Sequence, residues 1–214
     1  MSCCSSSGYG EVFDETLARR DAARYRRRGL QPPAQWIVDA VVAQGVSGTQ
    51  VLEVGGGVGA IQLELLKAGA ERTVNVEYSP GYEAAAAELA EEAGVAGHVA
   101  REIGDFAQNG GYEDADVVLM HRVVCCYPDY ERLVGQAARH ARHTLVFTFP
   151  PRNLLSRLIN GSSNLWMRMR RNEFRSYVHP PEAMIDVARK HGLEPVGRRR
   201  RRIWLAVSFA RPTH

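Results

Sequence analysis

The sequence predicts an α/β protein built on one mostly parallel, seven-stranded sheet, and three observations lead to this prediction. Short apolar runs of strand length alternate with helix-length segments from residue 49 to residue 192, a pattern typical of βαβ units. A glycine-rich turn follows the first apolar run. The last two apolar runs are separated by a short turn only, so they should pair antiparallel. The length of 214 residues suits a single domain with one sizeable core.

Residues 1–34 precede this alternation and are expected to form a mobile and partly helical cap. The first ten residues are rich in Ser, Gly and Cys and should be mobile. Apolar residues at roughly helical spacing, with arginines on the opposite face, predict a helix over 11–28. Two adjacent prolines then suit the start of the next helix, over 34–45.

Residues 35–214 are expected to form the main domain, with a helical lid inserted at about 151–180. Its strands are predicted from apolar, β-branched runs and its helices from amphipathic spacing. The predicted strands are 49–55, 72–79, 97–106, 115–124, 143–150, 193–199 and 203–212, and the helices between them are 60–70, 80–94, 129–141 and 180–192.

The stretch VLEVGGGVGA, residues 51–60, satisfies the G-x-G-x-x-G/A pattern of dinucleotide-binding turns. This pattern alone is a weak signal, because several ligands require a close approach of the backbone. No Lys-Ser or Lys-Thr pair follows the glycines, which disfavours the phosphate-binding loop of ATP and GTP hydrolases.

Of two carboxylates near this turn, Glu53 favours a methyl donor over a nicotinamide cofactor, and Glu77 fits either cofactor. Glu53 lies two residues before the first glycine, where it would repel a pyrophosphate but would suit a ligand with an ammonium group. Glu77 ends the next strand, where a carboxylate can accept hydrogen bonds from both ribose hydroxyls. Glycines at 55, 57 and 59 keep the backbone close to the ligand along the whole turn. Together these features favour S-adenosylmethionine, with NAD(P) as an alternative.

Four segments in succession resemble the motifs of class I S-adenosylmethionine-dependent methyltransferases: VLEVGGGVGAIQLELLKAGA, VNVEYS, IGDF and ADVVLMHRVV. The resemblance covers roughly residues 35–150. It implies a Rossmann-like methyltransferase sheet with an antiparallel last strand, and S-adenosylmethionine as cofactor. It also implies the cofactor-binding residues: Gly55, Gly57 and Gly59 at the methionine part, Glu77 at the ribose, Asp105 and Phe106 at the adenine, and His121 facing the sulfonium and the acceptor. Glu53 and Tyr78 are further candidate cofactor-binding residues.

The region after the fifth strand should determine which acceptor is methylated. Between residues 150 and 181, six apolar residues alternate with arginines, so the lid is expected to give the acceptor an apolar floor and a cationic rim. This region and the chain end resemble magnesium-protoporphyrin IX O-methyltransferases, chiefly at Arg175, Tyr177 and His179. The resemblance implies O-methylation of a carboxylate on an apolar, tetrapyrrole-like small molecule.

The residues leave the acceptor atom open. Methyl transfer is an in-line displacement that depends above all on alignment. A carboxylate acceptor needs only a cation to position it, for which Arg175 is the candidate. A natural-product hydroxyl or amine would need a base, either His121 or His179, with Tyr127 as a positioning group. These four residues are the candidate catalytic residues.

The cysteines form two adjacent pairs, Cys3-Cys4 and Cys125-Cys126. No C-x-x-C spacing indicates zinc, and no metal is expected as a cofactor. Reduced, structural thiols are one interpretation. The other is a four-thiol site that would bind a metalloid acceptor if the N-terminal segment folded over the pocket.

The net charge of +3 is unevenly distributed, with basic residues concentrated after residue 151. This asymmetry could steer an anionic acceptor, or it could indicate an RNA-methylating or nucleic-acid-binding protein. The run Arg198–Arg202 is weak evidence for the latter, because 25 of the 27 basic residues are arginine throughout the chain. No apolar run is long enough to span a membrane and the N-terminus lacks the pattern of a secretory signal, so a cytoplasmic protein is expected. The sequence leaves the oligomeric state open.

Overall fold

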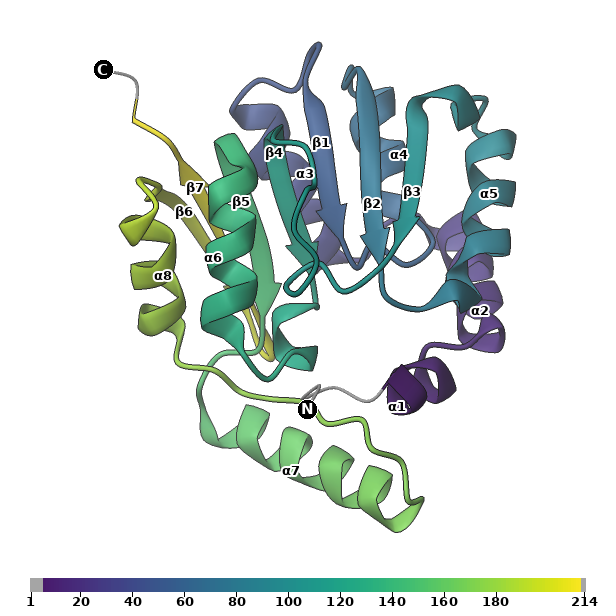
Figure 1. Ribbon diagram of the computed structural model, residues 1–214, viewed down its shortest axis with the longest axis vertical. Coiled ribbons are helices and arrows are strands. Elements are labelled where there is room, and N and C mark those ends of the chain that lie inside the picture. Colours follow the sequence, from purple (N-terminus) through teal and green to yellow (C-terminus); the bar gives the residue numbers. More distant parts are fainter. Residues whose placement is uncertain (1–5, 213–214) are drawn as a thin grey trace.

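The computed structural model describes residues 6–212 and contains a seven-stranded sheet in the order β3-β2-β1-β4-β5-β7-β6. All neighbouring strands are parallel except β7, which runs antiparallel to both β5 and β6 (Figure 1). The fold class predicted from the sequence is confirmed, including the antiparallel last strand. The strands are β1 (Gln50–Val54), β2 (Arg72–Glu77), β3 (Val99–Ile103), β4 (Ala115–His121), β5 (Ala141–Phe149), β6 (Glu194–Arg201) and β7 (Trp204–Ala210).

Helices cover both faces of the sheet, and the central strands are accordingly buried and apolar. On one face, α6 (Tyr130–His140) and α8 (Pro181–Lys190) pack on the largest core cluster. On the other, α3 (Pro32–Ala43) and α4 (Ala60–Lys67) enclose a second cluster (Figure 1). Near the β3 edge, α2 (Glu15–Arg28) packs against α5 (Glu83–Glu92).

The N-terminal segment differs from the single helix predicted over 11–28. It forms two helices, α1 (Ser6–Val12) and α2, and residues 6–10 belong to α1. The break has a local cause, because Asp14 takes an extended conformation and its carboxylate caps α2 by accepting from the Leu17 backbone N–H at 2.8 Å. Helical periodicity alone does not reveal such a cap when the apolar spacing continues across it.

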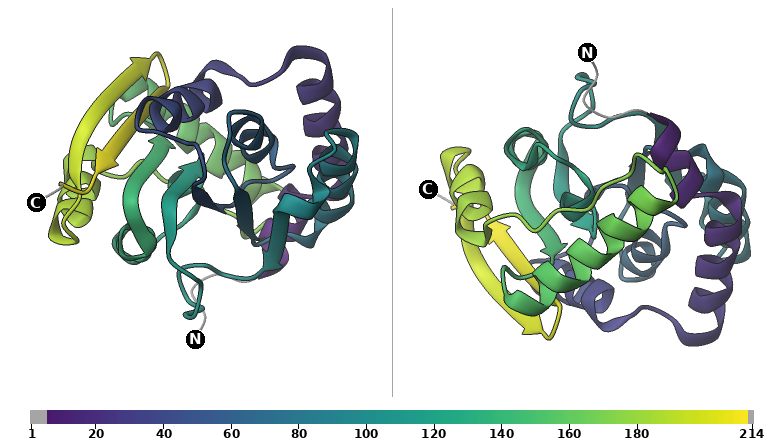
Figure 2. Two further views of the ribbon diagram at one scale, coloured as in Figure 1. Left: turned by 90° about the horizontal axis from the view of Figure 1, so that it is seen from above. Right: turned by 90° about the horizontal axis from the view of Figure 1, so that it is seen from below.

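The insertion after β5 contains α7 (Leu154–Met169), followed by an extended segment that leads to α8. Figures 1 and 2 show α7 lying across the carboxyl ends of the parallel strands, at the same end of the molecule as α1. Ligands of open α/β sheets bind at that end. α1 and α7 therefore lie at the end of the sheet where a functional site is expected.

The arginine run lies on β6 and the turn that follows it. β6 is the edge strand of the sheet, and charged side chains on an edge prevent pairing with another chain. Arg198 pairs with Glu182 at 3.2 Å and Arg199 pairs with Asp39 at 2.7 Å. Within residues 6–212, no helix is both long and apolar enough to cross a membrane.

Candidate active site

The glycine-rich turn connects β1 to α4 at the carboxyl end of the sheet. Gly55, Gly57 and Gly59 have φ values of +64°, +56° and +75°, a region that side chains disfavour. A Cβ at Gly55 would lie 2.7 Å from Cγ2 of Val123. The turn is therefore tight for both conformational and steric reasons, and it forms one wall of a cavity of about 410 Å³.

Glu53 lies at the floor of this cavity, one residue before the end of β1. Its side chain is 1% exposed, and its Oε2 has no hydrogen-bond partner among the described residues. Burial raises the pKa of Glu53 to about 8; the charge of Arg101 opposes this rise and that of Glu77 adds to it. The carboxyl group is therefore mostly protonated at neutral pH, and it is available to a ligand that supplies a positive charge.

The raised pKa of Glu53 predicts a pH-dependent loss of stability. A folded-state value of about 8 against an ordinary 4.5 means that the folded protein binds the additional proton. The stability of the ligand-free protein should therefore fall as pH rises through the window between these values. Replacing Glu53 with glutamine should remove that loss, leaving E53Q more stable than the wild type by a few kcal/mol at most near pH 8.

Urea denaturation of both proteins between pH 5 and pH 9 measures this difference. Parallel stability curves for wild type and E53Q would contradict the assignment of the raised pKa.

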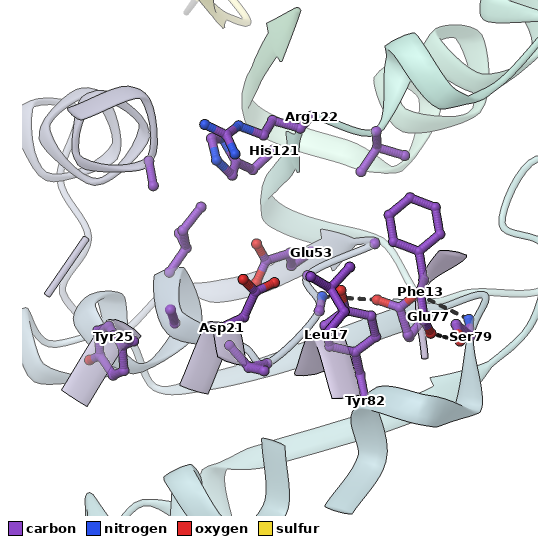
Figure 3. A pocket seen from close by; sticks show the side chains of 18 of the residues that line it. Phe13, Leu17, Asp21, Tyr25, Glu53, Glu77, Ser79, Tyr82, His121 and Arg122 are labelled. Atoms are coloured by element: carbon purple, nitrogen blue, oxygen red, sulfur yellow. Dashed lines mark hydrogen bonds between the residues drawn. The ribbon is translucent and has the colours of Figure 1, made fainter. Parts of the chain in front are cut away.

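Glu77, at the end of β2, is held by the backbone on either side of it. Its carboxylate accepts hydrogen bonds from the N–H groups of Gly57 and Tyr78, both at 2.9 Å, and of Ser79 at 3.1 Å. The side chain thus connects the glycine turn to the turn after β2. Three backbone donors fix its orientation along the cavity, and Figure 3 shows Glu77 beside Ser79.

Asp105 and Phe106 lie in the turn after β3, beside a smaller apolar cavity that continues from the first. Asp105 accepts hydrogen bonds from the Ala107 N–H at 3.0 Å and from the Tyr127 hydroxyl at 3.2 Å. Phe106 is buried and stacks on Tyr112. Both cavities share Tyr9, Gly55, Tyr78, Val123 and Cys126 in their lining, so they form one cleft along the strand ends.

His121 ends β4 and faces the large cavity. Burial, with the nearby charges of Arg122 and Arg24, lowers its pKa to about 3. The ring is therefore neutral throughout the physiological range. Its Nδ1 lies 3.0 Å from the hydroxyl of Thr148 on β5, which orients the ring.

Arg122 brings a positive charge to the same wall of the cavity. Its φ is +61°, unusual for a residue with a side chain. The guanidinium lies 4.5 Å from the ring centre of Trp204 and donates to Oε1 of Gln31 at 3.0 Å. Its Nε is buried and has no hydrogen-bond partner among the described residues. Arg122 belongs to the motif ADVVLMHRVV, from which the sequence predicted a role for His121 only.

The cap completes the cavity from the opposite side. Phe13, Leu17, Asp21 and Tyr25 come from the N-terminal segment and lie along the cavity, across from Arg122 (Figure 3).

Tyr9, on α1, ties the cap to the segment after α7. Its ring packs on Tyr78 at 4.9 Å and on Phe174 at 5.2 Å. Asn172 also donates to Glu11 at 2.6 Å. Tyr9 belongs to the first ten residues, which were predicted to be mobile, and no sequence signal indicated that it would lie at the cleft.

Arg175 and His179 do not line either cavity. Arg175 donates to the backbone carbonyls of Asn172 at 2.7 Å and of Phe174 at 2.6 Å. His179 donates from Nε2 to the Tyr127 carbonyl at 2.9 Å, and burial lowers its pKa. The structure therefore brings His121 and Tyr127 to the cleft, and it places Arg175 and His179 in the extended segment behind it.

Cys125 and Cys126 lie in the turn after β4, with their Sγ atoms 3.9 Å apart. Both thiols donate to the Arg122 carbonyl. The other pair, Cys3-Cys4, lies outside the described residues. Within the part of the chain that the structure describes, no group of three or more His, Cys, Asp or Glu side chains could hold a metal ion.

The fold is similar to that of known methyltransferases. Residues 52–147 match the family model described as a methyltransferase domain. The chain therefore carries a methyltransferase domain over these residues. It is an S-adenosylmethionine-dependent enzyme, and the cleft fits that cofactor, because the glycine turn admits close backbone approach and Glu53 has a free buried oxygen. No curated protein sequence matches this methyltransferase significantly.

Solved structures share the fold of this methyltransferase. Magnesium protoporphyrin IX methyltransferase from Synechocystis PCC 6803 with bound SAH has a TM-score of 0.71 and 20% identity, covering 94% of this chain and 99% of that one. Its structure with bound SAM gives 0.70 and 19%, covering 99% and 100%. An O-methyltransferase family protein from Burkholderia thailandensis gives 0.73 and 19%, covering 97% of this chain and 64% of that one.

Proposed function

We propose that this methyltransferase O-methylates a carboxylate on an apolar, tetrapyrrole-like acceptor. The observation that carries the proposal is Arg122, a half-buried cation in the cavity wall that has no ion pair among the described residues. The fold likeness to the magnesium protoporphyrin IX methyltransferase, which extends over nearly the whole of both chains, supports the same acceptor class.

The cofactor would lie along the cleft at the strand ends. The glycine turn and Glu53 would hold the methionine part, where an ammonium group would stabilise the ionised form of Glu53. Glu77 and Tyr78 would bind the ribose. Asp105 and Phe106 would bind the adenine in the smaller, mostly apolar cavity. When bound, S-adenosylmethionine supplies an electrophilic methyl group; the protein's contribution is alignment and charge.

Among the charged residues of the cavity, Arg122 favours an anionic acceptor. The lining contains two arginines, and Arg24 is already paired with Asp21 at 3.0 Å. Arg122 has no ion pair among the described residues, and burial lowers its pKa. A half-buried guanidinium without a counter-charge loses part of its hydration, and a bound carboxylate would offset that cost through charge-assisted hydrogen bonds.

The protonation state of His121 also agrees better with a carboxylate acceptor than with a hydroxyl acceptor. A carboxyl group is ionised at neutral pH and attacks without a base. A hydroxyl acceptor would need a base with a pKa near the working pH, and His121, with a pKa of about 3, is a weak one. His121 would therefore position the acceptor as a neutral ring.

The size of the cavity limits how the acceptor enters. About 410 Å³ must accommodate part of the cofactor as well, so a tetrapyrrole ring would remain largely outside. Only its carboxylate-bearing arm would reach Arg122. The acceptor would thus be recognised mainly by one charged group and by the apolar surface around the cavity mouth.

The test is methylation of magnesium protoporphyrin IX by the purified protein with S-adenosylmethionine, followed by mass spectrometry. We expect a monomethyl ester with the wild type. Arg122→Gln should lower kcat/KM roughly 30- to 150-fold, because it removes a charge-assisted contact of about 2–3 kcal/mol. Arg122→Lys should retain part of the activity.

Arg142→Gln, at an exposed arginine distant from the cleft, is the matched control. S-adenosylmethionine affinity should be nearly unchanged in all three variants. An unaffected rate in Arg122→Gln would return this residue to a structural role. Methylation of hydroxyl acceptors but of no porphyrin carboxylate would contradict the proposed function.

A further inference from the structure

Most apolar side chains of α7 are exposed to solvent rather than packed against the protein. Met169 is 76% exposed and Leu154 is 72% exposed. At 100° per residue, the exposed apolar residues occupy one face of roughly 140° along the whole helix. These residues, here called the α7 apolar face, are Leu154, Leu155, Leu158, Ile159, Leu165, Trp166 and Met169.

The side of α7 that packs on the protein is polar instead. Ser156 is buried. The amides of Asn160 and Asn164 donate to the Ser176 carbonyl at 2.9 Å and 2.8 Å, and the Ser176 N–H and hydroxyl donate back to Asn164 and Asn160. This hydrogen-bonded contact fixes the rotation of the helix about its axis. Its amphipathic pattern is therefore reversed relative to that of an ordinary surface helix, which buries its apolar stripe.

Arginines border the α7 apolar face on both sides. Arg157 and Arg168 fall along one border and Arg170 along the other, by the same helical geometry. The guanidinium of Arg170 lies 4.0 Å from the ring centre of Trp166. No acidic residue occurs between Glu131 and Glu173. An apolar face with a cationic border and an aromatic residue near that border is typical of helices that lie in a membrane interface.

We propose that α7 docks this protein onto an anionic lipid bilayer surface. Burial of the α7 apolar face among acyl chains removes it from water, and the arginines reach phosphate groups at the headgroup level. A second copy of the chain is a poorer occupant, because two α7 helices face to face would bring like charges together without any acidic partner.

The position of α7 gives this docking a consequence for the active site. The helix lies across the carboxyl ends of the strands (Figures 1 and 2), where the cleft is located. Docking would bring the cavity mouth close to the bilayer. An apolar acceptor dissolved in lipid could then enter the site without crossing water. The docking itself does not depend on which acceptor is methylated.

Vesicle co-sedimentation tests the proposal on the full-length protein. We expect binding to vesicles of phosphatidylcholine with phosphatidylglycerol, weaker binding to pure phosphatidylcholine, and a decrease at high salt. The double variant L158E/L165E should lower the partition coefficient by at least about tenfold, because two apolar contacts become charged. Trp166 fluorescence should shift to the blue on binding, and W166F should lose that shift.

The matched control is V42E/V196E, which places the same two charges at exposed apolar residues on α3 and β6. It should bind vesicles like the wild type. Thermal melting checks that both double variants fold, which is expected because the substituted positions are exposed. Equal vesicle binding by L158E/L165E and the wild type, or no binding by the wild type, would overturn the proposal. The proposal would also be overturned if the wild type formed a dimer, the L158E/L165E variant were monomeric, and the wild type did not bind vesicles.

Discussion

Replacing Glu77 with alanine is expected to weaken S-adenosylmethionine binding about 10- to 150-fold. A carboxylate in this position would accept hydrogen bonds from ribose hydroxyls, and the loss of such contacts costs about 1.5–3 kcal/mol. The structure adds a second reason, because Glu77 also accepts from the N–H groups of Gly57, Tyr78 and Ser79. Its removal leaves those donors unpaired and loosens the glycine turn. Isothermal titration calorimetry measures the change in Kd.

Glu113→Ala is the control, since Glu113 is an exposed acid distant from the cleft that pairs with the Arg72 side chain at 2.8 Å. Its affinity for the cofactor should equal that of the wild type. Glu77→Gln should lie between wild type and alanine, because an amide oxygen retains part of the acceptor capacity. An unchanged Kd in a folded Glu77→Ala protein would show that the assignment of the ribose site is wrong.

Replacing Gly56 with alanine is expected to cost roughly 1–3 kcal/mol of unfolding free energy and to reduce cofactor affinity at least about tenfold. A Cβ at Gly56 would lie 2.6 Å from Cδ of Glu53 and 2.9 Å from Oδ1 of Asn75. Both neighbours are buried and cannot move away. The turn must shift instead, which breaks the 2.9 Å hydrogen bond from the Gly56 N–H to Asn75.

Gly161→Ala gives the matched comparison for Gly56→Ala. Gly161 lies within α7 and has no atom within 4 Å of its added Cβ. Alanine there should stabilise the protein by about 0.5–1 kcal/mol, since it favours the helix. Urea denaturation compares the two variants, and a Gly56→Ala protein as stable as the wild type would refute the steric argument.

The arrangement of the sheet could be predicted from the sequence because its elements are locally encoded. The apolar run of β4 lies between polar segments, and the short turn between β6 and β7 leaves only antiparallel pairing. The glycine turn was equally readable, since three alternate glycines have no simpler explanation than positive φ. The predicted roles of Glu53 and Glu77 then follow from their sequence distance to that turn.

The cavity wall opposite the glycine turn could not be predicted in the same way. Arg122 acquires its place from Gln31 and Trp204, which are distant in sequence. Tyr9 reaches the cleft only because α1 separates from α2 at the Asp14 cap. These placements depend on tertiary contacts, and no spacing rule within one segment reveals them.

The lid shows a limit of reading amphipathic patterns. Alternating apolar residues and arginines predicted a helix over this segment, and α7 is present. The structure does not have the expected apolar floor, because most of these side chains are exposed and none lines either cavity. Helical periodicity identifies an apolar face but not the direction in which it points. Here Asn160 and Asn164 determine that direction through Ser176.

The most direct test of the central claim is a crystal structure of the protein with S-adenosylhomocysteine and magnesium protoporphyrin IX. The quantity to measure is the distance between the Arg122 guanidinium and the acceptor carboxylate. We predict a hydrogen-bond distance of about 3 Å, with the carboxylate beside His121 and the porphyrin ring outside the cavity. A bound acceptor whose carboxylates all lie away from Arg122 would contradict the account.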